Sequence, residues 1–294
     1  MSKYWVASHV TGIFSIEDEH PEIIHRGSLG AGFSISRGTT TYVENSDDNK
    51  NHIFFNGAEV NEEKAPISNH VLKHFIKFEE KKKNVKISLS VFHEFEIPLS
   101  CGFGASASGA IGLSLALNEF LDTKFPEIYL YQLAHKAEVI QGGGLGDVIG
   151  LLQGGWEYRV KAGAPGVGLA KNILENSYKV ASLSLGAIET KSVIKNEKWK
   201  QQINKVGHLF LKGFFDNPTI SNFATVSKQF SITSYLATPD VLRLMQDMEN
   251  EDVLVGQIML GNGIFIVYKN KSVLSKLENL IEEDICYSTI KKYN

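Results

Sequence analysis

Glycine is distributed unevenly along this chain of 294 residues, and that distribution restricts the fold more than any other feature. Fourteen of the 26 glycines fall between Gly102 and Gly168, where a proportional spread would place about 6. Glycine permits positive φ angles and lets the backbone approach a ligand closely. We therefore expect the backbone of this region to carry the chemistry of the protein.

A strand, a glycine-rich turn and a helix follow one another where the glycines begin. The odd positions of 86–97 are mostly apolar and alternate with polar residues, which indicates a half-buried strand. Pro98 ends that strand. The small residues after the turn lead into a helix that we expect over 108–121. Further upstream, 33–43 is also expected to be mostly β.

The rest of the glycine-rich region is expected to hold a second helix and another strand. The helix is predicted over 127–141, because Pro126 precedes it and three consecutive glycines follow it. The strand is predicted over 156–161, where aromatic and charged residues alternate. In that pattern Arg159 is expected to face solvent.

The segment Gly163-Ala164-Pro165-Gly166 indicates a linker between two domains, 1–165 and 166–294. The second half is expected to place helices on a small sheet, in an α+β arrangement. Its predicted strands are 180–185 and two runs around Asn262-Gly263, and its predicted helices are 199–214, 221–230, 241–248 and a closing helix through Val273, Leu277 and Ile281. The charged run 79–83 is expected to be a solvated turn.

Charge and cysteine content exclude several classes of protein. The 30 basic and 33 acidic residues give a formal charge of -3, which disfavours nucleic-acid and anionic-membrane partners. The two cysteines, Cys101 and Cys286, are too few for a disulfide framework or a thiolate metal cluster. We expect a cytoplasmic protein, without a signal peptide or a membrane-spanning run.

The segment Pro98–Gly109 has small residues at nearly every position between the strand and the helix. Its N–H groups, together with the positive end of the following helix, could bind phosphate oxygens. A tight turn with close helix packing explains the same residues equally well. A Walker A loop is excluded, because the chain has no Gly-Lys dipeptide. A dinucleotide fingerprint fits 102–107, but the alternating strand before it disfavours a doubly wound sheet.

The segment resembles the phosphate-binding motif of the GHMP kinases, Pro-x-x-x-Gly-Leu-Gly-Ser-Ser-Ala-Ala, with Phe103 and Ala105 as the departures. Two further motifs follow in the order of that family: a helix carrying Glu138, and the Gly-x-x-Asp turn that ends in Asp147. Each alone would be read as a surface glutamate or a simple turn. Three motifs in order favour a kinase.

The resemblance implies a fold, two cofactors and a set of site residues. The fold would have a ribosomal S5 domain 2-like, ATP-binding N-terminal domain and a ferredoxin-like C-terminal domain. Ser106 and Glu138 would hold Mg²⁺, and Asp147 would be the catalytic residue. The ATP phosphates would lie on Pro98, Ser100, Gly102, Gly104, Ala105, Ser106, Ala107 and Ser108.

Among GHMP kinases, the archaeal pantoate kinases are the branch that this sequence is most similar to. The similarity rests on 9–14, 27–32, 143–148 and 259–262. It implies transfer of the ATP γ-phosphate to the 4-hydroxyl of pantoate, in coenzyme A biosynthesis. Mevalonate, homoserine or shikimate as acceptor remain alternatives, as does a nucleotide-binding protein without catalysis, because the third glycine motif of the family is reduced to Met259–Gly263.

The carboxylate of the acceptor requires a cation or a group of N–H donors. Arg26 together with Ser28 is the leading candidate for it, because the planar guanidinium suits carboxylates, and Arg37 is a second candidate. His9 stands where many family members have lysine, so we expect it to contact phosphate or acceptor. A homodimer is a further hypothesis.

Overall fold

The computed structural model describes residues 2–175, 177–187, 196–250, 252–270 and 280–293. Its larger sheet has eight strands: the order β12-β1-β2-β5-β3-β4 forms the main path, β6 pairs with β2, and β7 pairs with β6. The bounds of these strands are Lys3–Glu17 (β1), Gly27–Asn45 (β2), His52–Phe55 (β3), Ala58–Val60 (β4), Leu89–Phe95 (β5), Trp156–Lys161 (β6), Leu169–Asn172 (β7) and Ile290–Tyr293 (β12).

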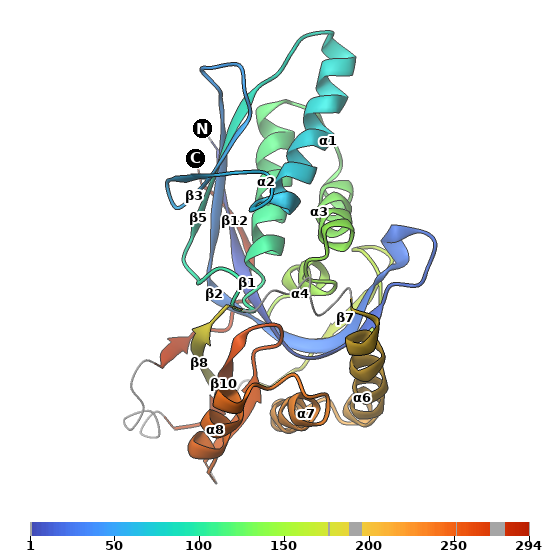
Figure 1. Ribbon diagram of the computed structural model, residues 1–294, viewed down its shortest axis with the longest axis vertical. Helices are drawn as coiled ribbons and strands as arrows, with labels where there is room; N and C mark the ends of the chain where they lie inside the picture. Colours follow the sequence, from blue (N-terminus) through green and yellow to red (C-terminus); the bar gives the residue numbers. More distant parts are fainter. Residues whose placement is uncertain (1, 176, 188–195, 251, 271–279, 294) are drawn as a thin grey trace.

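Helices cover one face of this sheet, as Figure 1 shows. They are α1 (Pro66–Lys83), α2 (Ala105–Phe120), α3 (Glu127–Gln141) and the short α4 (Asp147–Gln153), and a single 3₁₀ turn, η1 (Ile23–His25), lies between β1 and β2. A core of buried residues from α1, α2, α3 and the sheet, among them Trp5, Phe75 and Leu113, fills the layer between them. The described residues include no helix with the length and apolar character that a membrane crossing requires.

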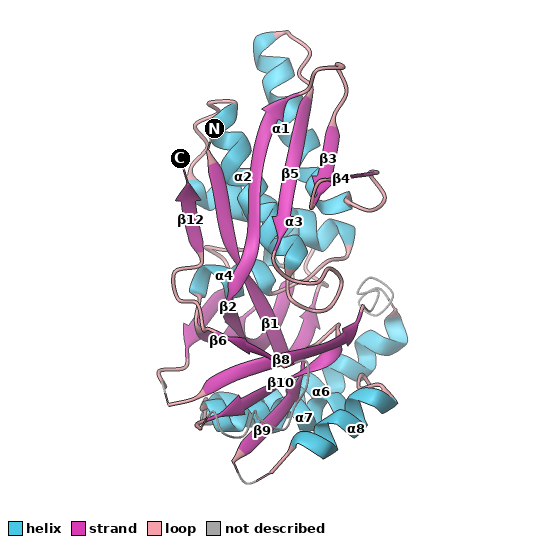
Figure 2. Cartoon of the chain, turned by 90° about the vertical axis from the view of Figure 1, so that its left-hand side faces the viewer, coloured by secondary structure: helices cyan, strands magenta, loops and turns pink. Residues whose placement is uncertain are grey.

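The second sheet has the order β11-β8-β10-β9, and all of its pairings are antiparallel. Its strands are Ile281–Glu283 (β11), Lys179–Gly186 (β8), Asn262–Tyr268 (β10) and Val253–Gln257 (β9), and its helices are α6 (Glu197–Asp216), α7 (Ile220–Thr233) and α8 (Pro239–Met248). Figure 2 shows this sheet crossing the lower end of the long strands β1 and β2. The expected α+β class is therefore confirmed.

Two strands that follow residue 165 belong to the larger sheet: β7 pairs with β6, and β12 pairs with β1. The division at 165 stays a prediction. The helix predicted over 127–141 has those bounds, and the predicted 108–121 helix begins earlier, at Ala105. The strand predicted over 86–97 is shorter, Leu89–Phe95.

Three other expectations need correction. Residues 79–83 are the last turn of α1 rather than a solvated turn, and the Glu79 side chain is fully buried beside Lys83. Asn262 and Gly263 do not form the turn between the two strands but are the first residues of β10. Residues 258–261 form the turn between β9 and β10. In the predicted closing helix, Val273 and Leu277 lie outside the described residues, and Ile281 begins β11.

Phe223 of α7 joins the two sheets. Its fully buried ring stacks on Phe265 of β10, with centroids 5.3 Å apart, and packs edge-on against Phe33 of β2 and Trp156 of β6. Because a buried ring between rigid elements leaves a cavity when it is removed, this contact stabilises the junction of the sheets.

We expect Phe223→Ala to lower the free energy of unfolding by about 3–5 kcal/mol. Equilibrium urea unfolding, followed by circular dichroism, measures the change. Leu209→Ala is the control, since Leu209 on the neighbouring α6 is 69% exposed and its truncation should change stability by under about 0.5 kcal/mol. Equal stabilities for the two variants would show that Phe223 does not support the junction.

Candidate active site

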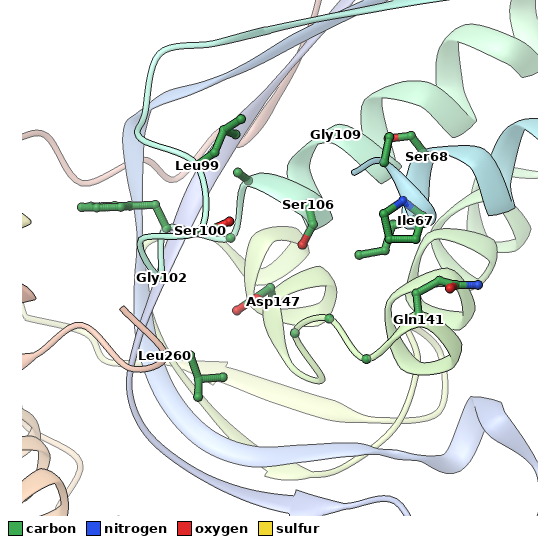
Figure 3. A pocket seen from close by; sticks show the side chains of 18 of the residues that line it. Ile67, Ser68, Leu99, Ser100, Gly102, Ser106, Gly109, Gln141, Asp147 and Leu260 are labelled. Atoms are coloured by element: carbon green, nitrogen blue, oxygen red, sulfur yellow. The ribbon is translucent and has the colours of Figure 1, made fainter. Parts of the chain in front are cut away.

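A cavity of about 650 Å³ opens between the glycine-rich segment, the start of α1 and the turn before α4. Figure 3 shows Ser106 above Asp147 in this cavity, with Ser100 and Gly102 of the segment beside them. The volume is in the range of small-molecule sites. Seven of the residues predicted from the sequence line it: Ser28, Ser100, Gly102, Gly104, Ala105, Ser106 and Asp147.

The wall formed by 99–106 exposes backbone amides at a helix start. Gly102 and Gly104 have φ of +82° and +65°, and a Cβ on Gly102 would lie 2.7 Å from the carbonyl oxygen of Met259. The first internal bond of α2 runs from the Ser108 amide to the Gly104 carbonyl at 3.1 Å. The amides before Ser108 in the first turn have no acceptor within the helix, so this end of α2 favours an anion.

Three of the predicted phosphate contacts do not line the cavity. Pro98 precedes the wall, and the side chains of Ala107 and Ser108 point into the protein. The Ser108 hydroxyl lies 2.7 Å from Thr39 Oγ1 in the core. Ala107 and Ser108 therefore contribute only their backbone to the start of α2, and their side chains pack in the interior.

Glu138 lies on α3, directly behind the turn that lines the cavity. Its side chain is fully buried, and its Oε2 accepts a hydrogen bond from the Gly144 amide at 2.6 Å. Its Oε1 is also buried and has no hydrogen-bond partner. Burial first, and then the negative charge of Asp147, raise the pKa of Glu138 to about 8, although the nearby Ser106 hydroxyl and the Gly144 amide act to lower it.

A divalent cation fits this arrangement. The unpartnered Oε1 is a hard oxygen ligand, and a cation there would offset the desolvation of the carboxylate. Within the described ranges, no three His, Cys, Asp or Glu side chains are grouped so as to hold a metal alone. That suits magnesium, which takes one or two protein ligands and completes its shell with water and phosphate oxygens.

Asp147 is the first residue of α4, and its side chain is 18% exposed at the cavity. Its Oδ2 faces Gly144, where a Cβ would collide with it. Glu138 bonds the amide of the same glycine. The structure thus brings the two acids together at one turn beside Ser106.

A buried chain of charges lies beneath Asp147. His9 of β1 is fully buried, with Nδ1 3.0 Å from Asp147 Oδ1 and Nε2 3.0 Å from Glu157 Oε1. Glu157 in turn accepts a hydrogen bond from Arg159 Nη1. His9 does not line the cavity. The structure therefore does not support the direct contact with phosphate or acceptor that we expected for His9.

The expectation that Arg159 faces solvent is wrong. Arg159 is fully buried, because helices cover both faces of β6: α4 lies over the charged side chains, and Tyr158 on the other face packs against Phe214 of α6. Alternation of charged and aromatic residues could not reveal this, since paired charges can occupy an interior face.

Arg26 and Arg37 do not line the cavity. The Arg26 guanidinium donates to the carbonyl oxygens of His20 and Pro21, at 2.5 and 3.3 Å. Arg37 forms a two-pronged pair with Glu283 of β11. Both guanidinium groups are therefore bound to other groups of the protein. Of the residues predicted to contact the acceptor, only Ser28 lines the cavity.

Comparisons with known proteins agree with this geometry. The family model "GHMP kinases N terminal domain" matches residues 69–155. Over nearly the whole chain, the sequence is similar to the pantoate kinase of Thermococcus kodakarensis (30% identity, covering 98% of this chain and 95% of the relative). It is also similar to the pantoate kinase of Methanocaldococcus jannaschii (32% identity, covering 95% and 98%).

Solved structures show the same relationship. A structure described as a phosphotransferase related to the CoA biosynthesis pathway superposes with a TM-score of 0.85 at 27% identity, covering 99% of this chain and 98% of that one. The mevalonate diphosphate decarboxylase of Enterococcus faecalis has a TM-score of 0.71 at 14% identity, covering 100% and 98%. The second similarity supports the fold alone.

The raised pKa of Glu138 makes stability depend on pH. Between about pH 4.5 and 8 the folded protein keeps a proton on Glu138 that the unfolded chain releases, so the free energy of unfolding falls as the pH rises through this window. In Glu138→Gln this contribution is absent. We expect the wild type to lose a few kcal/mol relative to the variant between pH 5 and 8, at about 1.4 kcal/mol per pKa unit.

Urea unfolding at a series of pH values measures the difference. Glu127→Gln, at the exposed start of the same helix, is the control and should keep the slope of the wild type. Parallel curves for the wild type and Glu138→Gln would contradict a proton on Glu138 at neutral pH.

Proposed function

Since this chain belongs to the pantoate kinase family of the GHMP kinases, we propose that it transfers the γ-phosphate of ATP to the 4-hydroxyl of pantoate, in coenzyme A biosynthesis. The observation that carries the proposal is the full-length similarity to two pantoate kinases, together with a cavity between an amide-rich helix start and two acids. Both cysteines are free and buried, in keeping with a cytoplasmic setting.

ATP would lie along the cavity with its phosphates on the wall 99–106. The α2 start supplies free amides and the positive end of a helix of 16 residues. Away from those amides, apolar side chains that suit a purine ring line the cavity beside the polar Glu63, Lys64, Ser68 and Gln141. The apolar side chains there are Phe55, Val60, Pro66, Ile67, Phe95 and Leu99.

Ser106 and Glu138 would hold Mg²⁺ between the α2 start and α3. The unpartnered Glu138 Oε1 and the nearby Ser106 hydroxyl are the oxygen ligands. When bound, the cation neutralises charge on the β- and γ-phosphate oxygens. Glu138 would then release the proton that burial otherwise keeps on it.

Asp147 would orient the acceptor hydroxyl and take its proton. Its Oδ1 is engaged by His9, which leaves Oδ2 for the hydroxyl. Phosphoryl transfer depends mainly on positioning and on charge stabilisation, so a carboxylate within hydrogen-bond reach of the hydroxyl suffices.

Ser28 and Arg159 replace Arg26 and Arg37 as our candidates for the acceptor carboxylate. Ser28 lines the cavity. Arg159 Nε is buried without a hydrogen-bond partner, and it lies beside Ser28 beneath Gly146, where a Cβ would meet both side chains. Arg159 does not itself line the cavity, so it would favour a carboxylate on the Ser28 hydroxyl through its charge from behind.

A panel of acceptors tests the proposed reaction. With ATP and Mg²⁺, we expect the purified protein to release ADP with pantoate at least tenfold faster than with mevalonate, homoserine or shikimate. A coupled assay measures the rates, and phosphorus NMR identifies the product as the 4-phosphate. Faster turnover of another acid would assign a different acceptor, and ATP binding without ADP release on any acid would indicate a protein without catalysis.

Asp147→Ala tests the assigned mechanism. We expect kcat to fall by about 10²- to 10⁴-fold, the usual contribution of a general base, while the dissociation constant for ATP and the circular dichroism spectrum stay unchanged. Asp122→Asn, in an exposed turn after α2, is the control and should keep full activity. Near-normal ADP release by Asp147→Ala would remove Asp147 from the mechanism.

A further inference from the structure

His9 is placed between two carboxylates in the interior. Nδ1 faces Asp147 Oδ1 and Nε2 faces Glu157 Oε1, both at 3.0 Å. Carboxylate oxygens accept hydrogen bonds, whereas a neutral imidazole has a single N–H. A neutral ring would therefore leave one of its nitrogens directed at an oxygen with no proton between them.

Glu157 is also paired with a cation on its other side. The same Oε1 that faces His9 also accepts a hydrogen bond from Arg159 Nη1, so it faces a permanent cation. With a charged ring, the two cations His9 and Arg159 balance the two anions Asp147 and Glu157. With a neutral ring, a net negative charge would be buried in this cluster, at a high cost in desolvation.

The fully buried ring lies close to the backbone of two glycines. A Cβ on Gly32 of β2 would lie 2.8 Å from Cε1 and Nε2, and a Cβ on Gly150 of α4 would lie 2.6 Å from Nε2. The His9 amide is also fixed, since it donates to the Phe103 carbonyl at 3.1 Å. Backbone and ring are thus both held against the wall of the cavity.

We propose that His9 is a positioning residue for the phosphoryl transfer: a buried imidazolium, held by Glu157, that binds Asp147 Oδ1 and directs Oδ2 to the acceptor. This inference rests on the proposed function. Burial by itself lowers the pKa of His9, but the hydrogen bonds and charges of Asp147 and Glu157 outweigh it and raise that pKa, which agrees with a charged ring.

The charge of His9 depends on the groups that surround it. Around His9 the facing groups are Asp147 and Gly150 of α4, Glu157 of β6 and Gly32 of β2, with Arg159 behind Glu157. Two carboxylates face the ring directly, and Arg159 lies behind one of them, which favours a charged ring.

The histidine ring nitrogens can be observed directly by ¹⁵N NMR of the full chain labelled at its nine histidines. We expect both nitrogens of His9 to be protonated at pH 7. His93 is an internal control: it is equally buried, but it bonds the hydroxyls of Thr41 and Ser68, and burial lowers its pKa to about 3. His93 should therefore be neutral in the same spectrum.

In Asp147→Asn the His9 ring loses one of its two anionic acceptors, so its deprotonation should move to lower pH. A neutral His9 ring in the wild type, or a ring whose titration is unchanged by Asp147→Asn, would overturn the proposal. Neither spectrum requires catalysis. If the wild type releases no ADP with pantoate, the proposed function fails while the spectra still decide whether His9 holds Asp147.

Kinetics of three variants complete the test. We expect His9→Gln to lower kcat by about 10- to 100-fold, the usual loss when the hydrogen-bond partner that orients a functional side chain is removed, with the KM for ATP unchanged within threefold. His9→Lys keeps a cation and should recover part of kcat. His52→Gln is the matched control, because His52 also lies between two carboxylates, Asp48 and Glu59, but at the surface on β3.

His52→Gln should keep the kcat of the wild type. Equal kcat values for His9→Gln and the wild type would overturn the proposal, and so would a His9→Lys variant no more active than His9→Gln. If His9→Gln does not fold, as judged by circular dichroism, the spectra of the wild type and Asp147→Asn decide the question.

Discussion

Three carboxylates, Glu138, Asp147 and Glu157, are held within one small volume beneath a cavity, and the surrounding structure offsets the cost of keeping them there. Like charges in a region of low dielectric repel strongly. Each acid is stabilised in a different way: Glu157 is paired with Arg159, Asp147 is paired with His9, and Glu138 keeps a proton at neutral pH. The roles proposed for these residues follow the same division: metal binding for Glu138, acceptor activation for Asp147 and structural support for Glu157.

The same crowding explains why glycine is concentrated in this part of the chain. Gly143 and Gly144 stand where any Cβ would collide with Glu138 and Asp147, and Gly150 and Gly32 leave room for the His9 ring. The backbone approaches the acids so closely that it also supplies the amide of Gly144 to Glu138. Several of the glycines in this region therefore accommodate buried charged side chains, in addition to those in the segment proposed to bind phosphate.

Sequence patterns predicted the elements whose structure is determined by residues close together in the chain. Proline and glycine gave the bounds of α3, and the small residues of 98–109 indicated the turn before α2. The patterns failed for Arg159, because periodicity assigns charge to the solvent face, and only the three-dimensional arrangement shows that its partner is Glu157. His9 was expected at the ligand because it stands where many family members have lysine, and no local signal reveals that a residue 138 positions away occupies its Nδ1.

The reduced third glycine motif still reaches the phosphate wall, through packing. The turn between β9 and β10 is anchored by the Met259 amide, which donates to the Thr11 carbonyl at 2.9 Å. At Gly261 a Cβ would collide with the Cys101 carbonyl, and at Gly102 a Cβ would lie 2.7 Å from the Met259 carbonyl. Two glycines that face each other let the second sheet press directly on the backbone that precedes α2. The contact requires only that residues 102 and 261 have no side chains. The shortened glycine motif is therefore sufficient for it, and a long loop of N–H donors is not needed. The C-terminal half thus fixes the position of the amides proposed to receive the phosphates, while Glu138 and Asp147, the acids proposed to act with them, come from the first half of the chain.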